Sequence, residues 1–217
     1  MRLKLILKLL DGNCLPCNYM YELSSALYKV LNEGNTDFTT WLHDKGYCKE
    51  KKSFKLFTFS NLYIPRFKIE GDRLGILTDT VQLIVSFYPI EAIEAFVMGV
   101  FRNRRMEIGD RKSRVAFEVM TVERLPEPEF TPKMTFKAIS PVFVEEQFPD
   151  TSRTVHLTPG DPRFAELLHL NLLEKYRAFH QQEPDPQWPV TRLKVLSAPK
   201  AKTIALRAGT PQETKMK

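Results

Sequence analysis

The stretch NYMYELSSALYKVLNEGNTDFTTWLHDKGYCKEKKSFKLFTFS, from Asn18 to Ser60, contains two helix patterns followed by a strand pattern. Apolar residues recur every three or four positions between Met20 and Asn32, which predicts an amphipathic helix. Asn35 or Thr36 can cap a second, shorter helix. The apolar run from Phe54 to Phe59 predicts the strand that follows.

The regions on either side of this stretch complete a larger unit. Alternating leucines predict a strand at 2–10, before the first helix. An extended region is expected at 74–88, then a helix at 90–102 and a strand at 113–125. The resulting order, βαββαβ, is that of a ferredoxin-like unit.

A second unit is expected after the proline-rich sequence LPEPE at 125–129. Its predicted elements are a strand at 134–144, an amphipathic helix at 163–180, and paired strands at 190–196 and 202–207. Because this unit stops before a second helix and a last strand, we expect the natural chain to continue for roughly 40 residues.

The predicted fold class is therefore α+β, with tandem ferredoxin-like (RRM-like) domains. The first domain is expected at 1–125 and the second, incomplete at its C-terminus, at 133–217. Residues 126–132 are predicted to form the linker between them. Since ferredoxin-like units serve many functions, this fold alone predicts none of them.

Composition limits the class of protein. The chain has 217 residues, 43% of them hydrophobic, and a formal net charge of +6, which favours a polyanionic partner; an ordinary basic surface is the alternative. Lys4 and Lys8 interrupt the apolar start, and no apolar run approaches the roughly 20 residues of a membrane span, so we expect a cytoplasmic protein without membrane contact. The odd count of three cysteines favours reduced thiols.

Three side chains of different chemistry stand out in the first stretch, a phenol, an imidazole and an ammonium: Tyr28, His43 and Lys49. Tyr28 also belongs to a second, hydroxyl-rich face of its predicted helix, with Tyr21, Ser24 and Ser25. A half-buried helix whose hydroxyls bond to the backbone is the simpler interpretation of that face. A single histidine near a helix end is likewise more often a surface residue than a catalyst.

The densest basic segment is RNRRMEIGDRKSR, predicted to be a loop or a hairpin leading into a strand. Its cations could contact phosphates, giving salt-dependent binding with little sequence preference. A solvated surface is the competing interpretation, since two acidic residues dilute the charge. The candidate RNA-binding residues are Arg102, Arg104, Arg105, Arg111, Lys112 and Arg114.

Cys14 and Cys17 form a C-x-x-C pair between a strand and a helix, as in thioredoxin-type redox proteins. The βαββαβ order is not that of thioredoxin, so a dithiol redox protein is only an alternative. One such pair supplies half of a zinc site, and other metal, Walker and nucleotide-binding signatures are absent from the sequence. No metal or cofactor is therefore predicted.

Three motifs resemble the Cas6 family of CRISPR-associated endoribonucleases: LPCNYMYELSSALY, LHDKGY and FKLFTFS. The element KAISPV is also similar to that family, whose glycine-rich loop near the C-terminus has no counterpart here. The resemblance implies two ferredoxin-like domains and RNA held on their surface. Its implied partners are CRISPR repeat RNA or pre-crRNA, CRISPR effector subunits and a second copy of the chain.

Members of this family that have a tyrosine, histidine and lysine triad cut RNA without metal, by attack of the ribose 2′-hydroxyl on the adjacent phosphate. The products are a 2′,3′-cyclic phosphate and a 5′-hydroxyl. The matching positions are Tyr28, His43 and Lys49, with Lys51 and Lys52 as alternatives to the lysine. The resemblance implies that His43 is the principal proton-transfer group and that Tyr28 is a proton donor or a positioning group. The lysine is expected to stabilise the negative charge of the transition state. A repeat-RNA binder without catalytic activity is the main alternative.

Overall fold

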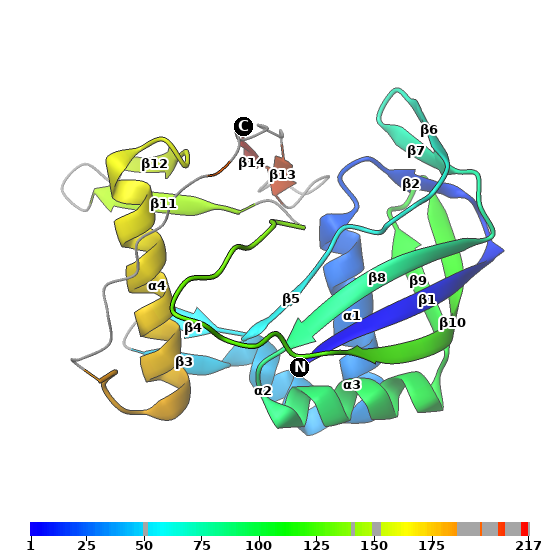
Figure 1. Cartoon of the computed structure of the whole chain (residues 1–217). Helices are drawn as coiled ribbons and strands as arrows, with labels where there is room; N and C mark the ends of the chain where they lie inside the picture. Colours follow the sequence, from blue (N-terminus) through cyan, green and yellow to red (C-terminus); the bar gives the residue numbers. More distant parts are fainter. Residues whose placement is uncertain are drawn as a thin grey trace.

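The fold is built on a five-stranded antiparallel sheet with the order β5-β8-β1-β10-β9 (Figure 1). The computed structural model describes residues 1–49, 52–139, 142–148, 153–185, 196, 204–206 and 214–216. The strands of this sheet are β1 (Arg2–Asp11), β5 (Phe57–Phe59), β8 (Thr80–Phe87), β9 (Arg105–Gly109) and β10 (Arg114–Leu125). The long strands predicted at 2–10 and 113–125 are confirmed.

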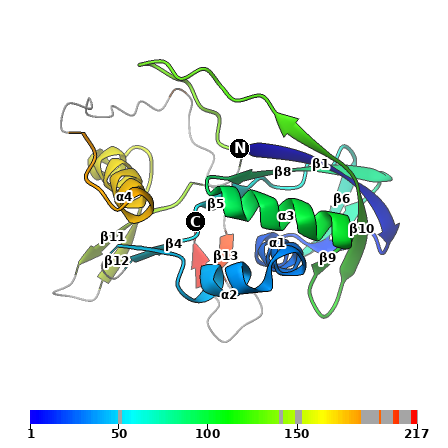
Figure 2. The same ribbon diagram turned by 90° about the horizontal axis from the view of Figure 1, so that it is seen from below.

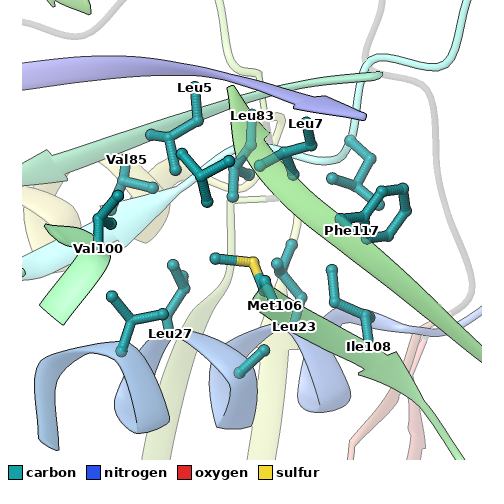
Figure 3. Close-up of a cluster of buried hydrophobic side chains, with 14 of the residues drawn as sticks. Leu5, Leu7, Leu23, Leu27, Leu83, Val85, Val100, Met106, Ile108 and Phe117 are labelled. Atoms are coloured by element: carbon teal, nitrogen blue, oxygen red, sulfur yellow. The ribbon is translucent and has the colours of Figure 1, made fainter. Parts of the chain in front are cut away.

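Strand β1 lies at the centre of the sheet, hydrogen-bonded to β8 and to β10. Leu3, Leu5 and Leu7 are buried, because alternate side chains of a strand point to the same face. Figure 3 shows Leu5 and Leu7 facing Leu23 and Leu27 of the helix below. This face of the sheet, with the helices that cover it, forms the core.

Two helices cover that face, α1 (Met20–Gly34) and α3 (Ile90–Arg102), and both were predicted from sequence (Figure 2). They pack so closely that a Cβ on Gly99 would overlap the carbonyl oxygen of Val30, and one on Gly34 would overlap that of Ala95. The two helix backbones are therefore in direct contact at this crossing.

A third helix, α2 (Thr36–Asp44), follows α1 directly. The Asn35 side chain accepts a hydrogen bond from the backbone N–H of Phe38 at 3.0 Å, which confirms the predicted cap. Leu42 is buried, while Phe38 and Trp41 pack half-buried against the core. The chain turns after α2 through Gly46, which has a φ of 66°.

Short strands form two further sheets beside the main one. One has the order β2-β7-β6, from β2 (Cys14–Pro16), β6 (Phe67–Glu70) and β7 (Arg73–Ile76). The other pairs β3 (Tyr47–Lys49) with β4 (Lys52–Phe54).

The prediction of one strand at 54–59 was wrong, because Leu56 takes a φ of 51° and separates β4 from β5. The extended region predicted at 74–88 is likewise divided, since β7 ends at Ile76 and β8 begins at Thr80.

The second half of the chain contains α4 (Pro162–His180), close to its predicted bounds. Phe164 and Ala178 are its buried residues, whereas Leu172 is 49% exposed. Beside α4 lies a hairpin of β11 (Val144–Phe148) and β12 (Arg153–Leu157). In the described part of the chain no helix is long and apolar enough to cross a membrane.

The strand predicted at 134–144 was wrong, since residues 134–139 belong to no strand and β11 begins at Val144. The predicted extended segment at 202–207 contains β13 (Ile204–Leu206), which pairs with β14 (Thr214–Met216). Its expected partner at 190–196 lies outside the described residues, apart from residue 196.

The crossing of α1 and α3 gives a stability prediction. Gly99→Ala should destabilise the protein by about 2 kcal/mol or more, because an added methyl group meets the rigid backbone of α1. Denaturant unfolding measures this difference. Gly160→Ala is the matched control, since its Cβ would meet only Thr158 Oγ1 at 3.8 Å. Equal stability of the two variants would contradict the close crossing.

Candidate functional site

Tyr28 of α1 and His43 of α2 lie side by side at the surface. Their rings meet edge to face with centroids 5.8 Å apart. Phe57 of β5 contacts the Tyr28 ring from another direction, with centroids 5.5 Å apart. The predicted tyrosine and histidine are thus brought together, and the tyrosine ring is held between two partners.

The two rings have different environments. Tyr28 is half-buried, and burial raises the pKa of its phenol above the ordinary value of 10.0. Tyr28 therefore keeps its proton at neutral pH and can donate it. The His43 side chain is 72% exposed, and its Nδ1 lies 2.9 Å from Oδ1 of Asp44. Because Asp44 occupies Nδ1, the other ring nitrogen, Nε2, is the one left for a ligand.

The candidate lysines lie on the β3–β4 hairpin. Lys49 of β3 pairs with Lys52 of β4 in the backbone ladder, while the side chain of Lys49 and the whole of Lys51 lie outside the described part of the chain. Lys52 Nζ binds both carboxylate oxygens of Glu174, at 2.6 and 2.7 Å. The Lys52 charge is therefore already compensated within the chain.

Lys55 is a residue that the sequence reasoning missed. Its Nζ donates a hydrogen bond to the backbone carbonyl of His43 at 2.8 Å. Ser53 Oγ donates to the carbonyl of Lys45 at the end of the same helix. Both bonds satisfy carbonyl groups that α2 leaves unpaired at its C-terminus, so they fix the backbone that carries His43. No sequence pattern predicts these two hydrogen bonds, because they form only when the turn after α2 brings Ser53 and Lys55 back to the end of the helix.

A groove of about 760 Å³ contains both Tyr28 and His43. Its walls come from one face of α1, from α2 and from the start of β9. Arg105 and Glu107 of β9 line the same groove. One of the predicted RNA-binding residues therefore lines the same groove as the candidate catalytic pair. The residues of α1 that line it are Tyr21, Ser24, Ser25, Ala26, Tyr28, Lys29, Val30, Asn32 and Glu33.

The basic segment forms the end of α3 and the β9–β10 hairpin, which confirms the predicted hairpin. Arg102 donates to the carbonyl groups of Glu33 and Gly34 at 2.6 and 3.3 Å, so it binds the C-terminus of α1. Arg105 and Arg114 both lie near Glu107, at 3.0 and 3.4 Å. These three cations thus already have partners within the chain.

Arg104, Arg111 and Lys112 are exposed. The last two form the tip of the hairpin, where one oxygen of Asp110 accepts from the backbone N–H groups of Lys112 and Ser113. The other oxygen of Asp110 accepts from Arg73 at 2.8 Å. The tip is therefore fixed in shape and presents its cations to solvent.

The cysteine pair lies at a different place. Cys14 belongs to β2, opposite Gly75 of β7, and both Cys14 and Cys17 are half-buried free thiols. Helix α1 begins three residues after Cys17. The described residues contain no group of three or more His, Cys, Asp or Glu side chains that could hold a metal ion.

Most of the chain matches a class of CRISPR-associated proteins. Residues 14–122 match the family described as CRISPR-associated protein Cas6, N-terminal, and residues 125–216 match CRISPR associated protein Cas6, C-terminal. The chain belongs to the Cas6 family. Its family-level function is CRISPR RNA processing by an endoribonuclease.

Two curated relatives support this membership. The chain is 30% identical over 197 residues to CRISPR-associated endoribonuclease Cas6 1 of Methanocaldococcus jannaschii, covering 89% of this chain and 72% of that protein. It is 27% identical over 175 residues to a putative CRISPR-associated endoribonuclease-like protein Cas6 of Pyrococcus furiosus, covering 79% and 67%.

Solved structures share the mixed α/β fold with its antiparallel sheets. A CRISPR associated protein Cas6 has a TM-score of 0.71 and 28% identity, over 99% of this chain and 83% of that one. A Cas6-related protein of Pyrococcus furiosus has a TM-score of 0.70 and 25% identity, over 85% and 73%. A structure described as a RAMP protein binding different RNA substrates is similar in fold, with a TM-score of 0.68 and 24% identity, over 85% and 73%.

Proposed function

We propose that this protein is a metal-independent endoribonuclease that binds CRISPR repeat RNA and cleaves pre-crRNA. The observation that carries the proposal is the edge-to-face contact of Tyr28 and His43 inside a groove that also contains Arg105. A proton donor, a proton-transfer group and a cation are the parts that phosphodiester cleavage by a neighbouring hydroxyl requires.

In the proposed reaction, the 2′-oxygen forms a bond to phosphorus while the bond from phosphorus to the 5′-oxygen breaks. The 2′-hydroxyl loses its proton to a base, and the leaving 5′-oxygen receives one from an acid. His43, through Nε2, is the principal proton-transfer group. Tyr28 keeps its proton at neutral pH, so it acts as a donor or as a positioning group. Lys49 supplies positive charge to the transition state.

RNA binding is assigned to the groove and to the β9–β10 hairpin beside it. Arg104, Arg111 and Lys112 are exposed cations, whereas Arg102 holds the end of α1. Arg105 and Arg114 share one carboxylate, so together they keep a net positive charge for phosphates.

The finer fold assignment is also a proposal. Strand β8 lies between β5 and β1, and β10 follows on the other side of β1. This order, with α1 and α3 on one face, supports a ferredoxin-like domain at 1–125. A linker at 126–132 and a second such domain at 133–217 complete the proposal. Effector subunits, a second copy of the chain and a cytoplasmic location remain expectations.

A repeat-RNA binder without activity is the second candidate, since the Pyrococcus furiosus relative is described as endoribonuclease-like. A dithiol redox role has less support, because Cys14 lies in a strand of a small sheet and is paired opposite Gly75.

His43 gives the first functional prediction. His43→Ala should slow single-turnover cleavage of the cognate repeat RNA in EDTA by roughly 100-fold or more, because it removes the proton-transfer group. RNA affinity should stay nearly unchanged. His169→Ala, on α4 and outside the groove, is the matched control. An unchanged cleavage rate in His43→Ala would refute the role of His43 in proton transfer. If the unmodified protein does not cleave the RNA, the repeat-RNA binder without activity is favoured instead.

Arg104 and Arg105 give the second prediction. Replacing both by alanine should weaken RNA binding and reduce the slope of log affinity against log salt by about one to two units, because fewer counterions are released. The control replaces two exposed cations elsewhere, Arg124 and Lys133. If both double variants keep the unmodified protein's slope, the basic cluster is only a solvated surface.

A further inference from the structure

The groove is longer than the reaction requires. Its walls extend from His43 along α1 to Tyr21, one face of the helix being shared by both tyrosines. Tyr21 precedes Tyr28 by seven residues, which is about 10 Å along the helix axis. The proposed chemistry uses only the end near His43, so the part near Tyr21 has no assigned role.

Tyr21 has the exposure of a stacking platform. Its side chain is 50% exposed, and in the described part of the chain no ring contact or hydrogen bond holds it. Tyr28, in contrast, is packed against Phe57 and His43. An accessible aromatic face at the rim of a groove is the feature on which proteins stack nucleobases.

Polar groups suited to a base edge lie between the two tyrosines. Ser24 and Ser25 are half-buried and line the groove. The expectation that their hydroxyls bond to the backbone is not met, since no hydrogen bond of either hydroxyl is found among the described residues, whereas Thr36 and Thr39 make such bonds to carbonyl groups. Both serine hydroxyls are therefore available as donors and acceptors to a ligand.

The groove walls carry charges of both signs, since Glu33, Asp44 and Glu107 line them together with two cations and His43. Lys29 is exposed on α1, and Arg105 stands on the β9 wall with its side chain 55% exposed. Glu107 holds Arg105 in place at 3.0 Å, which orients the guanidinium. The whole groove, including its end at His43, has a volume of about 760 Å³.

We propose that this part of the groove is a nucleotide subsite, which holds the nucleoside next to the scissile phosphate. Tyr21 stacks on its base, Ser24 and Ser25 hydrogen-bond to the base edge, and Arg105 contacts the flanking phosphate. The inference deepens the proposed function and rests on it for the choice of RNA as ligand.

The test is a set of repeat RNAs that each carry one abasic nucleotide. Affinities are measured in the His43→Ala background, so that the RNA stays intact. With Tyr21 present, one abasic position should weaken binding by roughly tenfold, because the stacked base is lost. In Tyr21→Ala the same position should change affinity less than twofold, since the platform is already missing.

Two variants serve as controls. Tyr21→Phe keeps the aromatic face and should retain the abasic sensitivity. Tyr63→Ala removes a tyrosine that is 63% exposed outside the groove and should leave the abasic pattern unchanged. The inference is overturned if Tyr21→Ala keeps the full abasic sensitivity at every position.

This experiment separates the two proposals because it measures binding and not cleavage. If the unmodified protein does not cut the repeat RNA while the His43→Ala protein shows a Tyr21-dependent abasic position, the nuclease is refuted and the subsite is supported. Normal cleavage with no Tyr21-dependent position would support the nuclease and overturn the subsite. Ser25→Ala, tested with all four bases at the sensitive position, should alter the base preference by roughly three- to tenfold.

Discussion

Helix α1 packs against the sheet and α3 on one side and faces the groove on the other. The packing of its buried side therefore determines which residues it presents to the groove. Its leucines face the sheet, and its contact with α3 at Gly34 and Gly99 leaves no room for a side chain. The opposite face therefore points outward in a fixed register. Because Tyr21, Ser25 and Tyr28 lie on that face, core packing determines where the phenol and the hydroxyls stand.

The second half of the chain is connected to the site through α4. Phe179 contacts Tyr47 and Tyr88, with ring centroids 5.2 and 4.7 Å apart, and Glu174 binds Lys52. A pair as exposed as Lys52 and Glu174 contributes about 0–1 kcal/mol, while aromatic pairs contribute about 0.5–1.5 kcal/mol each beyond the area that they bury. The Phe179–Tyr47 ring contact therefore does more than the ion pair to hold α4 against the β3–β4 hairpin, and the Phe179–Tyr88 contact holds α4 near the end of β8.

Regular elements were the predictable part of the fold. The helices α1, α3 and α4 have long apolar periodicities, and β1 alternates clearly, so packing and local preference agree. The break at Leu56 could not be predicted, since leucine has no preference for a positive φ. The strand predicted at 134–144 was wrong for a related reason. The segment is largely apolar, yet Phe136 is 76% exposed, so an apolar composition does not indicate a buried strand there.

The site was predicted only in part. The motifs named Tyr28 and His43, and the structure shows that their rings touch. From the sequence, Arg105 belonged only to the basic segment, which is far along the chain from Tyr28 and His43. The packing of β9 beside α1 places it in the groove that contains these two residues. Lys55 was missed, since the turn through Gly46 brings it to the end of α2. Contacts that only tertiary packing creates have no characteristic spacing in the sequence, so the sequence alone does not predict them.

The central claim is that RNA is cut by its own 2′-hydroxyl in the groove beside Tyr28 and His43. Its most direct test uses repeat RNAs that each lack a single 2′-hydroxyl, incubated with the unmodified protein in EDTA. The account predicts that cleavage is lost at one position alone, where binding is retained and where the intact RNA yields a 2′,3′-cyclic phosphate. Cleavage that persists in every singly 2′-deoxy RNA would contradict the account.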